Sequence, residues 1–223
     1  MKSRTSFRHL FRLVLPMAAA AVLLPAAGYN IRPWKPAAIE AYPAKMTSEG
    51  VTIAVEPLFT DSLAARVFDC PDMLARGIMP LAVIICNTNA FPVEVDGPSI
   101  ELQWEQERHR SVDPLYAVQC LYDKEKGKKV VRLPLPIPPI KIERDHAEAC
   151  QDFRFKYLGI KRVEPNVTAG GFLFIHLSNP AGIRDNLESA KVYVPNIYNG
   201  KTGSEMLFFE FDLKPAVDAV PKK

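Results

Sequence analysis

The stretch "PLAVIICN" (residues 80–87) is apolar at every position from Leu81 to Cys86. A strand that carries apolar side chains at both odd and even positions buries both of its faces, since successive side chains point to opposite sides of a sheet. We therefore interpret this stretch as the central strand of a β domain. Asn87 ends the apolar run, and Pro92 follows shortly after it.

Further strand patterns lie on both sides of this central strand. In the first half of the chain they are "VTIAVEP" (51–57), "FPVEV" (91–95) and "SIELQWE" (99–105), and in the second half "GFLFIHL" (171–177), "AKVYVPNI" (190–197) and "EMLFFEFDL" (205–213). Asn199-Gly200 between the last two strands is a strong hairpin signal. Short strands separated by turn residues at such intervals predict a mainly β, antiparallel β-sandwich.

Residues 112–158 interrupt this pattern with two helical segments. Asp113 is suited to cap a helix whose first residue is Pro114. Asp145 and Glu148 have the spacing of a capping box at the start of a second helix. We expect a helical pair inserted into a sandwich domain that spans residues 51–214.

Between the two helices lies the proline-rich stretch "LPLPIPPIKI" (133–142), with four prolines in six residues. This composition imposes an extended polyproline-type path. The stretch either packs over the domain as a strap or stays exposed and docks to another protein. Its candidate contact residues are Leu133, Leu135, Ile137 and Ile140.

The first 28 residues have the pattern of a secretory signal peptide. They carry basic residues and no acidic one, followed by an apolar run from Leu13 to Ala27 that contains two prolines. A membrane-spanning helix needs about 20 apolar residues, which is more than this run provides. We expect export to the periplasm, the cell envelope or the extracellular space, with a mature chain that begins near Tyr29. Without cleavage, the same segment is a membrane anchor.

The remaining terminal segments show no clear periodicity. Residues 29–50 hold three prolines and predict an extended linker, and residues 215–223 predict a frayed tail. The first 28 residues carry four positive charges and no negative one, so without them the net charge of +3 falls to −1. Nucleic-acid binding requires a clustered basic face, and we expect none.

The four cysteines are disulfide candidates, because the number is even and export leads to an oxidising compartment. Their spacing contains no Cys-x-x-Cys pair, which argues against a zinc ribbon or a thioredoxin-like redox site. Sequence leaves three connectivities open. The placement of the helices favours Cys120 with Cys150 and, with less support, Cys70 with Cys86.

The two halves of the β domain resemble immunoglobulin-like sandwich proteins of the bacterial envelope, many of which are lipoproteins. The resemblance lies in "GIMPLAVIICNTNAFPVEVDGPSIELQW" (77–104) and in the strands from "VEPNVTAGGFLFIHL" (163–177) to residue 213. It covers residues 51–104 and 160–213 and implies an immunoglobulin-like sandwich, while the function of this family is largely uncharacterised. Tyr29 stands where a lipoprotein carries its lipidated cysteine.

No catalytic motif or metal-ligand spacing is present in the sequence. His109 lies in a charged segment, His146 at a helix start and His176 within a strand. We expect no cofactor and no enzymatic activity.

The sequence favours an exported, non-catalytic binding or structural protein. Such a protein would be a subunit or adaptor of an envelope-associated complex, and its partners would be other envelope or membrane proteins. Membrane contact is expected only if the N-terminal segment is retained. The alternative function is that of a periplasmic or extracellular protein that binds a small ligand or a glycan. A third hypothesis is a hydrolase.

Overall fold

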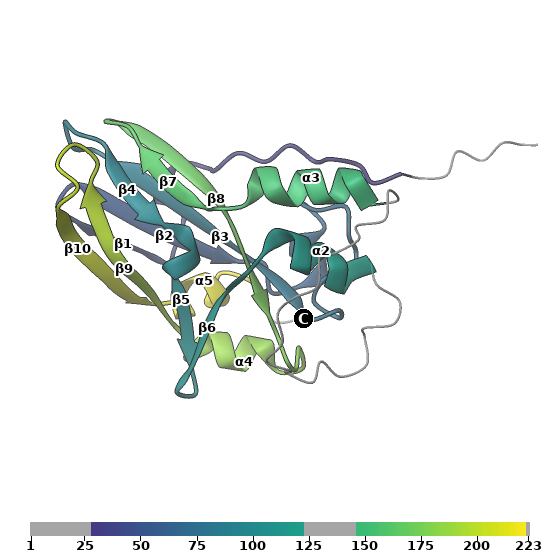
Figure 1. The fold of residues 1–223 in the computed structure, drawn as a ribbon. Helices are drawn as coiled ribbons and strands as arrows, with labels where there is room; N and C mark the ends of the chain where they lie inside the picture. The colour runs from purple at the N-terminus through teal and green to yellow at the C-terminus, as the bar shows by residue number, and fades with distance from the viewer. Residues whose placement is uncertain (1–27, 123–145, 222–223) are drawn as a thin grey trace, which may run out of the picture.

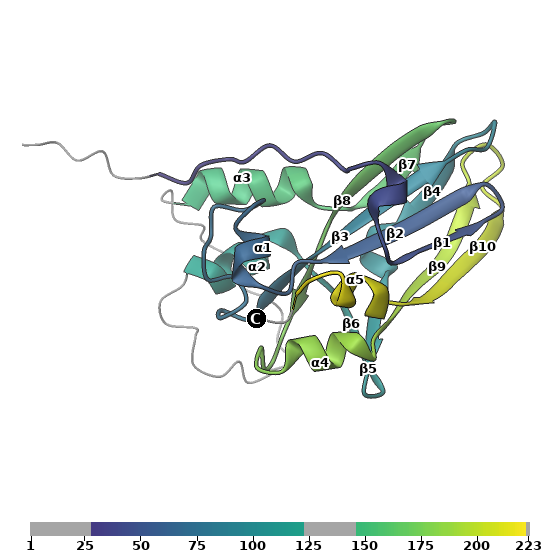
Figure 2. The same ribbon diagram turned by 180° about the vertical axis from the view of Figure 1, so that it is seen from behind.

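The computed structural model describes residues 28–122 and 146–221. The strands are β1 (Lys45–Ser48), β2 (Val51–Pro57), β3 (Ile78–Asn87), β4 (Val93–Asp96), β5 (Glu101–Trp104), β6 (Glu107–Val112), β7 (Ile160–Val163), β8 (Val167–His176), β9 (Lys191–Asn199) and β10 (Glu205–Asp212). The helices are α1 (Asp61–Ala64), α2 (Pro114–Tyr122), α3 (Ala147–Lys156), α4 (Ile183–Glu188) and α5 (Lys214–Asp218), with short 3-10 turns η1 (Ile39–Ala41) and η2 (Gly97–Ser99). Figures 1 and 2 show two β layers on one side of the molecule, α1, α2 and α3 on the other, and α4 and α5 along the lower edge of the layers.

The first layer has the order β1-β2-β3-β8 and is built around the central strand expected from the sequence. Strand β3 pairs antiparallel with β2 from Val51 to Pro57 and with β8 along its whole length. Every residue of β3 from Ile78 to Ile85 is buried. The uninterrupted apolar run therefore reflects a strand that is covered on both faces.

The second layer is arranged around β9. One edge of β9 pairs with β10, and the other pairs with β5 and then with β4, which in turn pairs with β7. Strand β6 joins the layers, because its first residues pair with β5 and Ser111 and Val112 pair with β8. All these strand pairs are antiparallel, so the predicted mainly β antiparallel sandwich is confirmed, with one side closed by β6.

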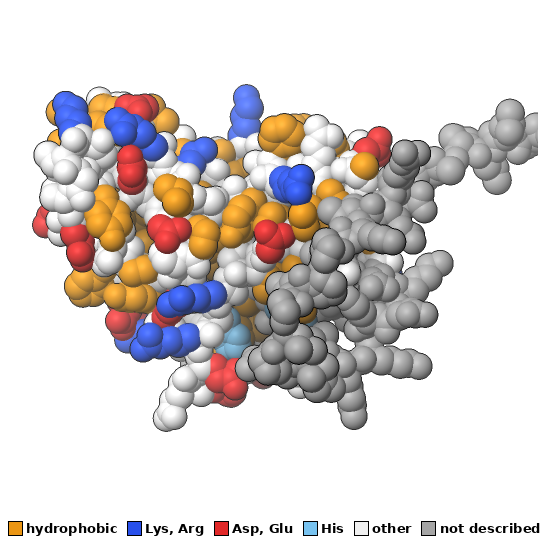
Figure 3. Space-filling model, in the orientation of Figure 1, with side chains coloured by type: hydrophobic (Ala, Val, Ile, Leu, Met, Phe, Trp, Pro, Cys, Tyr) orange, Lys and Arg blue, Asp and Glu red, His pale blue; other side chains and the backbone are white. Residues whose placement is uncertain are grey.

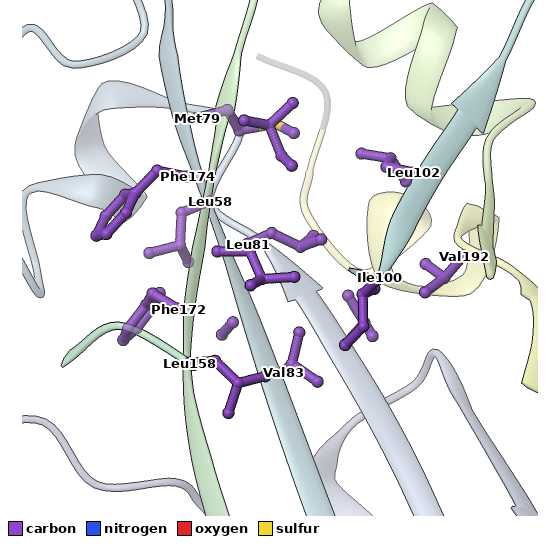
Figure 4. Packing of buried hydrophobic residues seen from close by; sticks show 14 of the residues in the cluster. Leu58, Met79, Leu81, Val83, Ile100, Leu102, Leu158, Phe172, Phe174 and Val192 are labelled. Carbon is purple, nitrogen blue, oxygen red and sulfur yellow. The ribbon is translucent and has the colours of Figure 1, made fainter. Parts of the chain in front are cut away.

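The two faces of the first layer bury different sets of side chains. Figure 4 shows Leu81 and Val83 of β3 directed toward Ile100, Leu102 and Val192 of the second layer. On the opposite face, Phe172 and Phe174 of β8 meet Phe68 and Phe153, with ring centroids 4.6–5.6 Å apart. This second cluster attaches α3 to the outer face of the first layer.

The inserted helical pair is also confirmed. The Asp113 carboxylate accepts a hydrogen bond from the Leu115 backbone N–H at 2.7 Å, as expected for a cap. Helix α3 begins after His146, whose side chain makes no capping hydrogen bond. Asp145, the strap residues and residues 1–27 lie outside the described part of the chain.

Two expectations about terminal segments are wrong, and one strand was not expected. Residues 29–50 do not form a free linker, because they contain β1 and pack against the domain. Residues 215–223 are not simply frayed, because Ala216 and Val217 of α5 are buried. Strand β6 occupies the charged segment around His109, for which no strand was expected. In each case contacts with distant residues order a segment that lacks strong local periodicity.

The hairpin between β9 and β10 follows the Asn-Gly signal. The Asn199 side-chain oxygen accepts backbone N–H groups of Lys201 and Thr202, and the Gly203 N–H donates to the Asn199 carbonyl. Within residues 28–122 and 146–221, the helices are too short and too polar to cross a membrane.

Candidate interaction surface along helix α3

The N-terminal lead-in, which we define as residues 28–34, runs alongside α3. Figures 1 and 2 both show this first described segment lying against the helix. The Tyr29 hydroxyl donates a hydrogen bond of 2.6 Å to Oδ2 of Asp152, and it accepts one of 3.4 Å from the Asp69 backbone N–H. The first residue of the expected mature chain is thus part of the folded domain.

Asp152 is buried and holds two partners at once. Lys156, one turn further along α3, donates to the Asp152 carboxylate at 2.7 Å and to the Val67 carbonyl at 2.8 Å. Burial, then the hydrogen bond to Asp152 and its charge, raise the pKa of Tyr29 above its ordinary value. Burial lowers the pKa of Lys156, although Asp152 opposes this effect. The phenol therefore stays neutral and serves as a donor to a charged acceptor.

Three further contacts hold the lead-in beyond Tyr29. Asp69 accepts hydrogen bonds from the Arg32 guanidinium at 2.7 Å and from the Asn30 backbone N–H at 2.9 Å. The Trp34 ring packs edge-on against Phe172 at 4.5 Å between centroids. A Cβ atom at Gly170 would lie 3.1 Å from the Trp34 ring, so this glycine leaves the space that the indole uses.

Large apolar side chains are exposed on the same side of the molecule. Phe155 of α3 is 80% exposed, Ile160 at the start of β7 is 78% exposed, and Ile31 of the lead-in is 47% exposed. We call these three residues the α3 face. Figure 3 shows hydrophobic side chains over α3 and β7, interspersed with charged ones. The helix thus buries one stripe in the core and presents an aromatic residue to the outside.

A second candidate site is a shallow groove of about 270 Å³ beside the β5–β6 hairpin. Its lining is mostly polar and comprises Gln103, Trp104, Gln106, Glu107, Arg108, Ser189 and Lys191. Trp104 is buried, and its ring stacks on His109 with centroids 3.6 Å apart, which occupies an aromatic face. The groove can offer hydrogen bonds and charges but little aromatic surface for a sugar ring.

An ion-pair cluster holds the hairpin next to this groove. The buried Glu101 carboxylate accepts hydrogen bonds from the Arg110 guanidinium at 2.5 and 2.9 Å and from the Gln103 amide at 3.0 Å, and it lies 3.5 Å from Arg108. Burial alone would raise the pKa of Glu101, but the hydrogen bonds and the two cations lower it below its ordinary value. The carboxylate is therefore held in its charged form.

None of the four cysteines, which all lie in the described residues, forms a disulfide in the structure, so neither predicted bridge is present. Cys70 precedes β3 and lies near Tyr122 of α2, whereas Cys86 is the penultimate residue of β3 and pairs with Thr52 and Thr168. At about 3.3 Å per residue, Cys86 lies about 26 Å from the start of its strand. The predicted pairing of Cys70 with Cys86 is therefore wrong, because the fold places them at different ends of β3.

The other cysteine pair lies on helices that pack against each other, Cys120 on α2 and Cys150 on α3. Cys150 is buried, and burial raises the pKa of its thiol. The candidate strap contacts Leu133, Leu135, Ile137 and Ile140 lie outside the described residues. The bridge between Cys120 and Cys150 and the docking role of the strap stay predictions.

The three histidines of the mature region each contact an aromatic ring. His109 stacks on Trp104, His146 stacks on Tyr122 at 4.3 Å, and the His176 ring lies 6.1 Å from that of Tyr116. Among the described residues no three His, Cys, Asp or Glu side chains are grouped so that they could hold a metal ion. The structure therefore gives each histidine a packing contact.

The α3 face was missed at the sequence level. Ala149 and Phe153, four residues apart on α3, belong to its buried stripe. Phe155, two positions after Phe153, lies off that stripe, because two residues on a helix are rotated by about 200°. A large apolar residue outside the buried stripe of a helix indicates an exposed apolar surface, and this pattern could have been recognised in the sequence.

Comparison with known proteins gives no family assignment. No family model and no curated protein matches the chain. One solved structure, that of ycdA, a putative lipoprotein of Bacillus subtilis subsp. subtilis strain 168, is 11% identical with a TM-score of 0.36. The match covers 77% of this chain and 39% of that one. A likeness of this size assigns neither a fold nor a function, so both rest on the residues described above.

Proposed function

We propose that the protein is an exported, non-catalytic binding protein that acts as a subunit or adaptor of an envelope-associated complex. The export-type pattern of residues 1–28 supports this role. The observation that carries the proposal is the contact between Tyr29 and Asp152, directly after that segment. A domain that begins at the exit of an export segment, with no free linker, is suited to work close to the membrane.

Cell fractionation with N-terminal sequencing of the native protein tests the export step. We expect a mature chain that begins near Tyr29, or a retained N-terminal segment in the membrane fraction. An intact chain in the soluble cytoplasmic fraction would contradict export.

Native gel electrophoresis of the mildly solubilised envelope tests the complex. We expect the protein in an assembly larger than its own 24.9 kDa. Migration as a free monomer from the envelope fraction would contradict the subunit role.

The groove beside β5 and β6 supports a second candidate function, which is the binding of a small polar ligand. Arg108 and Lys191 supply positive charge, and Glu107, Gln103 and Gln106 supply acceptors and amides. A thermal-shift screen of anionic and sugar ligands tests this function. Stabilisation that is lost in Arg108→Ala but kept in Arg162→Ala would support it, since Arg162 is a charged residue that does not line the groove.

A further inference from the structure

We propose that the α3 face, formed by Ile31, Phe155 and Ile160, rests on the lipid surface of a membrane. This inference rests on the proposed envelope role. It adds the orientation of the domain relative to the membrane. The proposal is that the exposed apolar side chains contact lipid rather than another protein.

The first argument is the distribution of exposed large apolar residues. In the described part of the chain they are Ile31, Met46, Phe155, Ile160, Val167 and Phe208. The two that are most exposed, Phe155 and Ile160, lie on consecutive elements, because α3 ends at Lys156 and β7 begins at Ile160. Ile31 lies on the lead-in that runs along α3, and both ribbon views place these elements on one side.

The second argument is the position from which the N-terminal segment leaves the domain. A Cβ atom at Gly28 would lie 3.5 Å from the Glu148 carboxylate, so the chain enters the described structure at the start of α3. The apolar run of the export segment extends to Ala27, the residue before it. Each residue spans at most about 3.6 Å, so in a chain that retains the N-terminal segment in the membrane this end of α3 stays close to the lipid.

The third argument is the charge around the apolar side chains. Arg154 is exposed next to Phe155, and the half-exposed Lys161 follows Ile160. Asp152, the acidic residue closest along the helix to Phe155, is buried and bound to Lys156. Glu148, seven residues before Phe155 and on the same side of α3, is exposed. The cations next to Phe155 and Ile160 in the chain suit a membrane interface with anionic headgroups, and Glu148 at the start of α3 weakens this attraction without removing it.

Photocrosslinking of the full chain in vesicles tests the proposal. The vesicles contain phosphatidylcholine, phosphatidylglycerol and a lipid with a photoreactive group near its headgroup, and crosslinked peptides are mapped by mass spectrometry. We expect crosslinks in residues 147–160 besides those in the N-terminal segment. The double variant Phe155→Asp/Ile160→Asp should lower the crosslinks in 147–160 about tenfold, because each change removes apolar contact with the lipid.

Phe208→Asp is the matched control, since Phe208 is 61% exposed on β10, outside the α3 face. It should leave the crosslinks in 147–160 unchanged, and thermal unfolding should show that both variants fold. Vesicles of phosphatidylcholine alone should give fewer crosslinks, since they lack anionic headgroups.

Three results would overturn the proposal. The first is crosslinking confined to residues 1–27, and the second is equal crosslinking of the double variant and the wild type. The third is a dimer in sedimentation experiments that Phe155→Asp dissociates, because a second copy would then cover the face. None of these results bears on export or on the native complex, so the proposed function is tested separately.

Discussion

The hydroxyl of Tyr29 donates a hydrogen bond of 2.6 Å to the carboxylate of Asp152, which lies 123 positions further along the chain. The acceptor is charged and buried, so this bond is stronger than one between two neutral groups. It ties the N-terminal lead-in to α3, and through the Phe153 ring cluster α3 is tied to the first β layer.

Tyr29→Phe should lower the free energy of unfolding by about 2 kcal/mol, because a hydrogen bond to a charged acceptor is lost. Tyr42→Phe is the matched control. The Tyr42 hydroxyl accepts a bond of 2.9 Å from the Ala37 backbone N–H, and both groups are neutral, so we expect about 1 kcal/mol. Urea unfolding measures both values, and equal losses in the two variants would contradict the special strength of the Tyr29 bond.

The same residue gives stability a dependence on alkaline pH. Burial and Asp152 raise the pKa of Tyr29 above its ordinary 10.0, so its stabilising contribution is complete below that pH. Above pH 10 the unfolded chain ionises first, and the contribution is lost as the pH rises toward the folded-state pKa. The difference in unfolding free energy between wild type and Tyr29→Phe should therefore shrink between pH 9 and pH 11. A constant difference would argue against this titration.

Gly97→Ala should destabilise the protein by about 2–3 kcal/mol, through a steric clash. A Cβ atom at Gly97 would overlap the backbone carbonyl oxygen of Leu158, which a side-chain rotation cannot relieve. Gly159→Ala is the control, since a Cβ at Gly159 meets no atom within 4 Å. Thermal unfolding should show a large loss for the first variant and little change for the second. Similar melting temperatures would contradict the close approach.

Gln106→Gly should stabilise the protein by about 1 kcal/mol. The two-residue turn between β5 and β6 places Glu105 at φ 50° and Gln106 at φ 66°, a left-handed region that favours glycine. Gln103→Gly, within β5, should instead destabilise the protein. Chemical denaturation of both variants gives the comparison, and destabilisation by Gln106→Gly would show that its side chain holds the hairpin.

Cys70 and Cys86 should remain free thiols in the exported protein. Burial raises the pKa of the Cys70 thiol to about 11, so a thiol reagent should modify it slowly at neutral pH and rapidly after unfolding. Non-reducing peptide mapping checks both residues, and a peptide that joins them would contradict the fold. The same map tests the remaining predicted bridge, between Cys120 and Cys150.

Strands with buried faces could be predicted from the sequence, because one buried face gives alternating apolar residues and two buried faces give an uninterrupted apolar run. The run from Leu81 to Cys86 and the alternation in Val51–Pro57 both correspond to observed strands. Strand β6 has no such period, since its residues are exposed or half-buried, and pairing with β5 and β8 positions it. Local pattern could not identify this strand.

The candidate surface was harder to predict than the fold. The lead-in is ordered by one phenol that reaches a carboxylate on a distant helix, and no local pattern encodes this contact. The pairing of Cys70 with Cys86 failed for a related reason, because spacing along the chain does not give the distance along a strand. Phe155 could have been found, since it departs from the buried stripe of its own helix.

Strand β6 also determines how the two layers can move. Because its two ends pair with different layers, separation on that side requires breaking hydrogen bonds in both at once. On the other side, β1 and β10 lie close together, and in the described chain each pairs with a single strand. Thermal breathing of the sandwich should therefore be asymmetric, with the β1–β10 side opening first and the β6 side acting as the hinge.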